Sequence, residues 1–333
     1  MRIAVTYDLR ADYLAMGMSE EECAEFDVEV TISSLVKALA ALGHEPVRIG
    51  NIHALTQRLA AGERWDAAFN ICEGISGYAR EAQVPALLEA YNIPHVFSDA
   101  LTQAVSLDKA WTKRIVAAAG VPTASFEVIE HAADAARITL PFPLFVKPIA
   151  EGSGKGVNSR SKVNNPAELK AVALELLARF RQPVLVETYL PGRELTVGIV
   201  GTGEEARALG VLDIIPNDTA ETPDYGFENK ENCDDNVSYQ LIDDAEGQRA
   251  ADVALGAWRA LRCRDGGRID IRYDAAGYPQ FIEVNPLAGL NPEHSDLCFI
   301  ARFRGLDYQD LIGLIMSSFL RRHPELAGRR AAA

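Results

Sequence analysis

The chain has 333 residues, of which 48% are hydrophobic and 24% are charged, so its composition is that of an ordinary globular protein. This length exceeds what one simple core needs and predicts two or three domains. The formal net charge of −14 excludes broad nucleic-acid binding, because no face-wide excess of Lys and Arg exists to neutralise phosphates. It leaves room for a local cationic pocket that binds a nucleotide.

The five cysteines are scattered without a CxxC spacing, which indicates reduced thiols rather than a zinc site or a disulfide framework. The chain opens on a strand-like segment without an apolar signal core, and no apolar run reaches membrane-spanning length. We therefore expect a cytoplasmic protein with no membrane partner and no nucleic-acid partner.

The first hundred residues predict a small doubly wound α/β domain. The alternation of strand and helix implies a parallel sheet with right-handed crossovers. The acidic stretch 12–29 is too irregular to assign. Strands are expected at 3–7, 45–50, 66–72 and 94–98, and helices at 31–43 and 83–93.

The rest of the chain predicts an α+β arrangement with antiparallel strands, so the expected fold class is α/β and α+β. The polar stretch 216–235 is typical of a functional lid or of disorder, and the last seven residues are expected to fray. Helices are expected at 107–120, 166–180, 246–262 and 307–320, and strands at 121–129, 142–148, 183–190, 193–201, 208–215, 268–273 and 280–285.

Residues 268–285 predict a hairpin, because two runs of alternating apolar and polar side chains flank a connection that contains Gly and Pro. Pairing Tyr273 with Gln280 across this connection sets Asp270 opposite Glu283. Two directly opposed carboxylates repel each other unless a cation lies between them.

The same pairing sets Arg268 opposite Asn285, and strand periodicity puts Phe281, Glu283 and Asn285 on one face. A hard divalent ion with oxygen ligands would remove the repulsion between the carboxylates. Salt bridges from Arg268 and Arg272 would do the same. The hairpin alone leaves both interpretations open.

Residues 151–156, EGSGKG, form a Gly-rich loop directly after a strand, and such loops can wrap phosphates with backbone N–H groups. The loop is not a P-loop, because its ends lack the required Gly and the required Ser or Thr. Residues 201–206 match the looser dinucleotide fingerprint but lead into a strand, which favours a hairpin turn over an NAD-dependent dehydrogenase. Lys109 and Lys147 are placed to hold a triphosphate together with the Gly-rich loop.

Five motifs occur in series between about residues 65 and 320: LDK…TK, FVKP followed by EGSGKG, VLVE-x-x-L-x-G-x-E-x-TV, RIDIR and EVNPLAGL. Together they resemble the ATP-grasp enzymes, and among these the D-alanine–D-alanine ligase branch. The resemblance implies that two sheets clamp ATP between them, after an N-terminal α/β domain. The implied boundaries are 1–100 for the N-terminal domain, 101–186 for the central subdomain with the Gly-rich loop, 187–325 for the C-terminal subdomain and 326–333 for a frayed tail.

The resemblance also implies residue roles. ATP contacts are expected from Lys109, Lys147, Glu151, Gly152, Ser153, Gly154, the hinge residues Glu187, Thr188, Tyr189 and Leu190, the ribose-binding Glu194, and Lys230 of the mobile loop. Mg2+, with Mn2+ as the alternative ion, is expected on Asp270, Glu283 and Asn285. Arg268 and the Gly289 backbone resemble the groups that stabilise an oxyanion, and the further expected catalytic residues are Ser153 and Lys230. Ser295 resembles the residue that binds the carboxylate of the amine-bearing substrate.

The side of the first, carboxylate-donating substrate departs from the family pattern. Glu73 and Arg80 stand within the elements that replace the usual His-Gly and Gly-Glu-Asp-Gly, and Lys155 stands in the Gly-rich loop where an apolar residue is common. The expected first-substrate contacts are Glu29, Glu73 and Arg80, with Asp27 as the alternative to Glu29 for the amine. The identity of the carboxylate substrate therefore stays open.

The activity that the resemblance implies is an ATP- and Mg2+-dependent carboxylate–amine ligase that acts through an acylphosphate. Its substrates would be small-molecule amino acids, with D-alanyl-D-alanine as the default product. The alternatives are a ligase for another amino-acid or specialised-metabolite pair, and a non-catalytic ATP-binding regulatory module. The retained set Arg268, Asp270, Glu283 and Asn285 argues against the regulatory module. A homodimer is expected from the resemblance.

Overall fold

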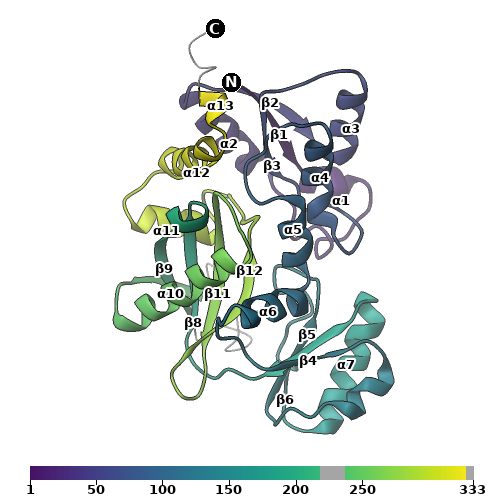
Figure 1. Cartoon of the computed structure of the whole chain (residues 1–333). Helices are drawn as coiled ribbons and strands as arrows, with labels where there is room; N and C mark the ends of the chain where they lie inside the picture. Colours follow the sequence, from purple (N-terminus) through teal and green to yellow (C-terminus); the bar gives the residue numbers. More distant parts are fainter. Residues whose placement is uncertain (218–236, 328–333) are drawn as a thin grey trace.

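The computed structural model describes residues 1–217 and 237–327, which form three β-sheets with helices packed around them (Figure 1). The N-terminal sheet lies at the top of Figure 1, and the two larger sheets lie below it on either side of the segment that carries α5 and α6. The expected α/β and α+β fold class is confirmed. Lys230 and nearly all of the expected lid 216–235 lie outside the described residues.

The N-terminal sheet is parallel, in the order β2-β1-β3, and both of its faces are buried. Ile3 and Val5 pack on one side with the helix α2, whereas Ala4 packs on the other side with α3 and α4. This alternation is the period of two that a strand imposes. The elements of this part are β1 (Arg2–Tyr7), α1 (Arg10–Ala15), α2 (Glu29–Ala41), β2 (Glu45–Gly50), α3 (Ile52–Ala60), β3 (Ala67–Ile71), η1 (Arg80–Ala82) and α4 (Gln83–Ala90).

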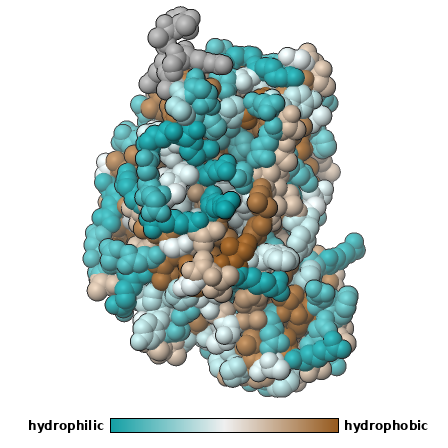
Figure 2. Space-filling view, viewed as in Figure 1, coloured by the Kyte–Doolittle hydropathy of each residue, from teal (hydrophilic) through white to brown (hydrophobic). Residues whose placement is uncertain are grey.

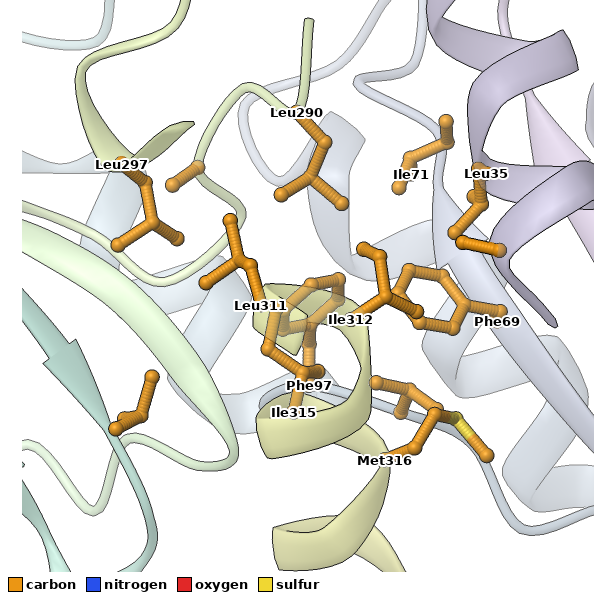
Figure 3. Close-up of a cluster of buried hydrophobic side chains, with 14 of the residues drawn as sticks. Leu35, Phe69, Ile71, Phe97, Leu290, Leu297, Leu311, Ile312, Ile315 and Met316 are labelled. Carbon is orange, nitrogen blue, oxygen red and sulfur yellow. The ribbon is translucent and has the colours of Figure 1, made fainter. Parts of the chain in front are cut away.

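A helix from the end of the chain, α12 (Tyr308–Arg322), completes the core on the first face of this sheet. Ile312 lies beside Phe69 of β3, and Ile315 lies beside Phe97, in a cluster that also holds Met316 and Leu35 of α2 (Figure 3). The N-terminal and C-terminal parts of the sequence therefore share one hydrophobic core. A short helix, α13 (Pro324–Ala327), follows.

The second sheet is antiparallel, in the order β4-β7-β5-β6, and one face is covered by α7. The helix α7 begins after Asn165, whose side chain accepts hydrogen bonds from the backbone N–H groups of Ala167 and Glu168, and Pro166 occupies its first position. These signals were readable in the sequence, and the expected helix is confirmed. The elements are β4 (Phe126–Ile129), η2 (Ala132–Arg137), β5 (Leu144–Pro148), β6 (Lys162–Val163), α7 (Pro166–Phe180) and β7 (Val184–Thr188).

The third sheet is antiparallel, in the order β10-β9-β8-β11-β12. Trp258 of α10 packs on one face of this sheet, and Leu297 and Ile300 of α11 pack on the other. The GTGEEA segment forms the connection between β8 and β9, as expected. The elements are β8 (Glu194–Val200), η3 (Gly203–Glu205), β9 (Arg207–Pro216), β10 (Val237–Ile242), α10 (Ala245–Ala260), β11 (Gly266–Tyr273), β12 (Pro279–Asn285) and α11 (Asp296–Phe303).

The hairpin of β11 and β12 sets Asp270 opposite Glu283 and Arg268 opposite Asn285, as the sequence predicts, although the strand ends next to the connection pair differently. A bulge follows Asp270, so Tyr273 pairs with Pro279 and not with Gln280. Because the bulge adds one residue to β12, Phe281 turns into the core while Ile282 and Glu283 both face a cavity. The prediction that Phe281 shares a face with Glu283 is wrong for this reason.

Several short elements differ from expectation. Residues 94–98 make only one isolated bridge, between His95 and Ala68, instead of a strand. The helices α3, α11 and α5 (Ala100–Leu107) were not predicted, and α5 runs directly into α6 (Lys109–Ala118) with Asp108 as the cap of the second helix. In the irregular stretch 12–29, the end of α1 is followed by turns, and α2 begins at the last residue, Glu29.

The viewed face is largely hydrophilic, with hydrophobic residues gathered along its middle (Figure 2). Among residues 1–217 and 237–327, no helix combines the length and the apolar character needed to cross a membrane. The domain boundaries inferred from the sequence stay a prediction.

Candidate functional site

Two adjoining cavities lie where the three sheets meet. The large cavity, of about 520 Å³, is lined by the N-terminal part and by the segment after β12. The small cavity, of about 90 Å³, lies between β5 and β7 on one side and β11 and β12 on the other. Lys109, Glu151 and Glu283 line both cavities, so these residues mark the junction between them.

A buried carboxylate held by two lysines lies at the small cavity. Glu187, on β7, lies 2.9 Å from the Nζ atoms of both Lys113 and Lys147. Burial alone would raise the pKa of Glu187, but the two lysines outweigh it and lower this pKa to about 2. Lys147, at the end of β5, lines the small cavity, whereas Lys113 of α6 is fully buried behind Glu187.

The small cavity also has side chains that suit a flat ring and its sugar. The ring of Tyr189 stacks with Phe145 and lies under two cations, with Lys162 Nζ 4.1 Å and the Arg272 guanidinium 5.5 Å from its centroid. Arg272 also donates to Glu194 at 3.1 Å. The cavity thus combines an aromatic wall, backbone groups of the segment after β7, and one carboxylate.

Oxygen-rich side chains meet at the junction. Asp270 accepts hydrogen bonds from Thr196 at 2.8 Å, from Arg268 at 2.7 Å, and from the Asn285 amide at 3.4 Å. Glu283 lies 3.3 Å from the Lys109 Nζ. The opposed carboxylates are therefore each paired with a cationic side chain, as the salt-bridge interpretation expected for Asp270.

Asp270, Glu283 and Asn285 have the donor chemistry of a metal site. Two opposed carboxylates and one amide oxygen are hard donors of the kind that Mg2+ prefers. Within the described part of the chain no group of three or more His, Cys, Asp or Glu side chains gathers as a metal site. The residues therefore fit a Mg2+ ion that takes part of its shell from substrate phosphates, and not an ion held by protein alone.

The Gly-rich loop is tied to the N-terminal part by a buried ion network. Glu25 accepts a hydrogen bond from the Gly152 N–H at 2.8 Å and lies 3.1 Å from Arg80 and 3.2 Å from Lys155. All three charged side chains are nine-tenths buried or nearly so. Ser153, the next residue of the loop, has a φ of 51°, a strained value outside glycine.

The far end of the large cavity is built by the segment after β12. A side chain at Gly289 would lie 2.8 Å from the Ser295 hydroxyl, so the backbone and this hydroxyl approach closely only because residue 289 is glycine. The Ser295 hydroxyl accepts a hydrogen bond from the Asn291 N–H. Arg268 reaches the same end, 3.5 Å from Asp296.

The structure brings most of the expected site residues together around these two cavities. The residues that line one or both cavities are Glu73, Lys109, Lys147, Glu151, Gly152, Ser153, Gly154, Glu187, Thr188, Tyr189, Leu190, Glu194, Arg268, Asp270, Glu283, Asn285, Gly289 and Ser295.

Two expected first-substrate contacts do not line the large cavity. Glu29 begins α2 and pairs with Arg48 at 2.7 Å on an exposed surface, because its position on the helix faces β2. Arg80 lies behind the cavity wall, where it pairs with Glu25 and donates to the Ala150 carbonyl. The alternative amine contact, Asp27, does line the cavity.

Sequence reasoning missed three residues of the site. Lys113 could have been found, because it is the second lysine of the LDK…TK motif. Glu81 follows Arg80 directly in a replaced element and lines the large cavity. Glu25 lies in the acidic stretch without periodicity, and nothing in the sequence marked it.

Comparison with known proteins gives consistent matches. The family described as D-ala D-ala ligase C-terminus matches residues 115–317. The D-alanine–D-alanine ligase of Gluconobacter oxydans is 33% identical over 297 residues, which cover 88% of this chain and 94% of that protein. That of Aquifex aeolicus is 33% identical over 288 residues, which cover 86% and 94%.

Solved structures show the same fold at lower identity. The D-alanine–D-alanine ligase from Bacillus anthracis complexed with ATP has a TM-score of 0.72 at 22% identity, covering 98% of this chain and 99% of that chain. The VanG D-Ala:D-Ser ligase from Enterococcus faecalis has a TM-score of 0.72 at 20% identity, covering 96% and 99%.

Two facing sheets, with buried lysines on one side of the cleft and opposed carboxylates on the other, define the ATP-grasp class of enzymes. The structural neighbours have this fold. The chain belongs to the D-alanine–D-alanine ligase family, a family of enzymes that form C–N bonds.

Proposed function

We propose that this protein uses ATP to join the carboxylate of one amino acid to the amine of another, with D-alanyl-D-alanine as the default product. The observation that carries this proposal is the junction of the two cavities at Lys109 and Glu283. A nucleotide in the small cavity would point its terminal phosphate at that junction. An acid in the large cavity would meet it there, beside Arg268.

The reaction would proceed in two steps. A carboxylate oxygen attacks the γ-phosphorus, and the bond between this phosphorus and the β–γ bridging oxygen breaks. The products of this step are ADP and an acylphosphate. The ammonium group of the second amino acid loses one proton to solvent, and the resulting amine attacks the acyl carbon. The bond between this carbon and the phosphate oxygen then breaks, inorganic phosphate leaves, and the nitrogen loses its second proton to solvent as the amide forms. Arg268 and the Gly289 backbone are placed at the large cavity to stabilise the oxyanion of this second step.

The residues of the small cavity would bind and orient the nucleotide. Lys147 supplies positive charge toward the phosphates, and its own pKa is raised because Glu187 and Glu283 outweigh the effect of burial. Tyr189 offers the ring wall, and Glu194 offers a carboxylate for ribose hydroxyls. Positioning and charge neutralisation of this kind supply most of the catalysis in phosphoryl transfer.

Asp270, Glu283 and Asn285 would hold Mg2+, which when bound supplies positive charge to the phosphate oxygens. Asp270→Asn keeps the shape of the side chain but removes its charge. We expect it to lower ATP turnover at least a hundredfold, and unchanged turnover would contradict the assignment of Asp270.

Two rival functions are weighed against this proposal. A ligase for another amino-acid or specialised-metabolite pair is compatible with the altered first-substrate side. A non-catalytic ATP-binding module would have no use for Arg268 at the far cavity, so the geometry favours an enzyme.

The experiment is phosphate release from ATP and Mg2+ over a panel of D- and L-amino acids, singly and in pairs, with mass spectrometry of the products. Stoichiometric phosphate and dipeptide with any pair support the ligase. A protein that binds ATP but releases no phosphate with any pair would favour the regulatory module.

A homodimer stays a prediction of the family resemblance, and a cytoplasmic location stays a prediction from the cysteine pattern and the apolar runs of the sequence. Light scattering during size-exclusion chromatography tests the first, with about twice the 36.2 kDa chain mass expected. A monomer mass at working concentration would contradict it.

A further inference from the structure

Eight carboxyl groups line the large cavity, among them the exposed Glu293, against three Lys or Arg side chains, Arg10, Lys109 and Arg268. Four of the carboxylates that line it have a cationic neighbour among the described residues: Glu25 and Glu151 lie near Lys155, Glu283 near Lys109, and Asp296 near Arg268. These four belong to the loop network and to the junction described above.

Three other carboxylates of the same cavity, Asp27, Glu73 and Glu81, form no ion pair with any described residue. The nearby cation that acts on both Glu73 and Glu81 is Arg80, and it is itself paired with Glu25. Glu73 and Glu81 both line the cavity, and after burial the charge of Glu81 is the largest influence that raises the pKa of Glu73. The Thr31 hydroxyl is also buried at this cavity wall. None of the described residues has hydrogen-bonding geometry to it, although it is close enough to Asp27 to lower the pKa of that carboxyl.

A triphosphate in the adjoining cavity would add further negative charge beside these groups. Like charges in a partly buried site repel each other, so a ligand that brings positive charge into the large cavity would stabilise the ionised form of these carboxyl groups beside the phosphates. The α-amine of one amino acid supplies a single positive charge, which Asp27 can take. That leaves Glu73 and Glu81 without a counter-charge.

Space permits a larger acid than alanine. The cavity volume of about 520 Å³ lies within the range of roughly 300–1,000 Å³ that is usual for sites of drug-sized ligands. The cavity runs from Arg268 and Gly289, where the acyl carbon would react, to the N-terminal carboxylates. A side chain of several methylenes would span this distance and end among the acidic residues.

We propose that the carboxylate-donating substrate is a basic amino acid, whose side-chain amine or guanidine binds between Glu73 and Glu81 while its α-amine binds Asp27. This inference rests on the proposed ligase function and narrows its first substrate. Glu73 and Glu81 are then specificity-determining residues, because they select a side chain and do not touch the reacting atoms.

The test is isothermal titration calorimetry of the full chain with Mg2+ and a non-hydrolysable ATP analogue. The probes are lysine and ornithine, each as D and L isomers, against the neutral isosteres norleucine and norvaline and against alanine. We expect one basic isomer to bind at least tenfold more tightly than its isostere. Glu73→Gln and Glu81→Gln should each reduce this preference to threefold or less, while the exposed control Glu204→Gln on the β8–β9 connection should leave it unchanged.

Each outcome decides a separate point. Equal or tighter binding of the neutral acids overturns the inference, as does the absence of binding by every basic acid. A preference that survives both Glu→Gln changes also overturns it, because the basic acid then binds at the amine-substrate site or elsewhere. If the preference is as expected but the bound acid gives no phosphate release with any amine, the inference stands and the ligase function fails.

Discussion

Glu187 holds two lysines that differ in their exposure. The sequence resemblance placed it beside adenine, and it does line the small cavity, but its carboxylate is held by Lys113 and Lys147 at 2.9 Å each. One of these lysines faces the cavity and the other is enclosed by protein. Lys147 can therefore contact a ligand in the small cavity, whereas the role of Lys113 is structural.

This separation predicts different effects for the two lysines. Lys147→Met should weaken ATP binding roughly tenfold to a hundredfold, the range of a lost charged hydrogen bond of about 1.5–3 kcal/mol. Lys113→Met should instead lower the free energy of unfolding by about 3 kcal/mol, because it removes one partner of a buried ion pair. Titration calorimetry and urea unfolding measure the two effects, with the exposed Lys170→Met as the control. A larger loss of ATP affinity in Lys113→Met than in Lys147→Met would contradict the assignment.

Asp27 has an unusual protonation equilibrium. Burial raises its pKa to about 7, with the neighbouring Asp8 also raising it and the Thr31 hydroxyl acting against this. Between about pH 4 and pH 7 the folded protein therefore keeps a proton that the unfolded chain releases. Because the folded state binds more protons there, the free energy of unfolding falls as the pH rises through this window.

Asp27→Asn should flatten that slope. Relative to the variant, the wild type should lose up to about 4 kcal/mol of unfolding free energy between pH 4 and pH 8, the equivalent of about three pKa units. Urea unfolding at these two pH values measures the difference, and Asp12→Asn on the exposed side of α1 is the control. Parallel pH profiles for wild type and Asp27→Asn would show that Asp27 titrates normally.

At the scale of elements, the Gly-rich loop depends on a segment far away in the sequence. Three departures from the family pattern meet in the structure, because Glu25 of the acidic stretch pairs with both Arg80 and Lys155. Glu25 also takes the N–H of Gly152, one of the backbone donors that the loop could offer to a phosphate. The acidic stretch and the loop therefore form one connected wall of the large cavity.

Glu25→Gln should loosen this wall without unfolding the protein. Amide hydrogen exchange of residues 151–156 should rise at least tenfold in the variant, because the charged hydrogen bond and the two ion pairs are lost together. Glu22→Gln, on the same stretch but bonded only to Ser19, is the matched control. Unchanged exchange in the loop would mean that Glu25 does not hold it.

The elements also show what the sequence could predict. The helix α7 was found at its observed ends because a capping Asn, a first-turn Pro and apolar periodicity agreed. The helices α5 and α11 each have eight residues and were not predicted, although α4, which has the same length, was. The register of Asp270 and Glu283 followed from alternation, but the bulge beside them depends on the packing of Phe281 and is not visible in local sequence.

At the scale of the whole molecule, the three sheets and the nucleotide side of the cleft were predictable, because their motifs each lie on one strand or one loop. The first-substrate side was not, because it is assembled from the acidic stretch, the turn after β3 and the segment after β12, which meet only in the folded chain. The packing of α12 on the N-terminal sheet is another long-range contact of this kind (Figure 3). Sequence position alone would have assigned that helix to the C-terminal subdomain.

The measurement that tests the central claim most directly follows one oxygen atom. The acid that supports turnover is prepared with ¹⁸O in its carboxylate. Mass spectrometry then measures the ¹⁸O content of the phosphate released from ATP in the presence of Mg2+. An acylphosphate route transfers one labelled oxygen to every phosphate released with product, and this is the result we predict. Unlabelled phosphate, with amide product formed, would contradict attack by the carboxylate on the γ-phosphate and with it the proposed use of the two cavities.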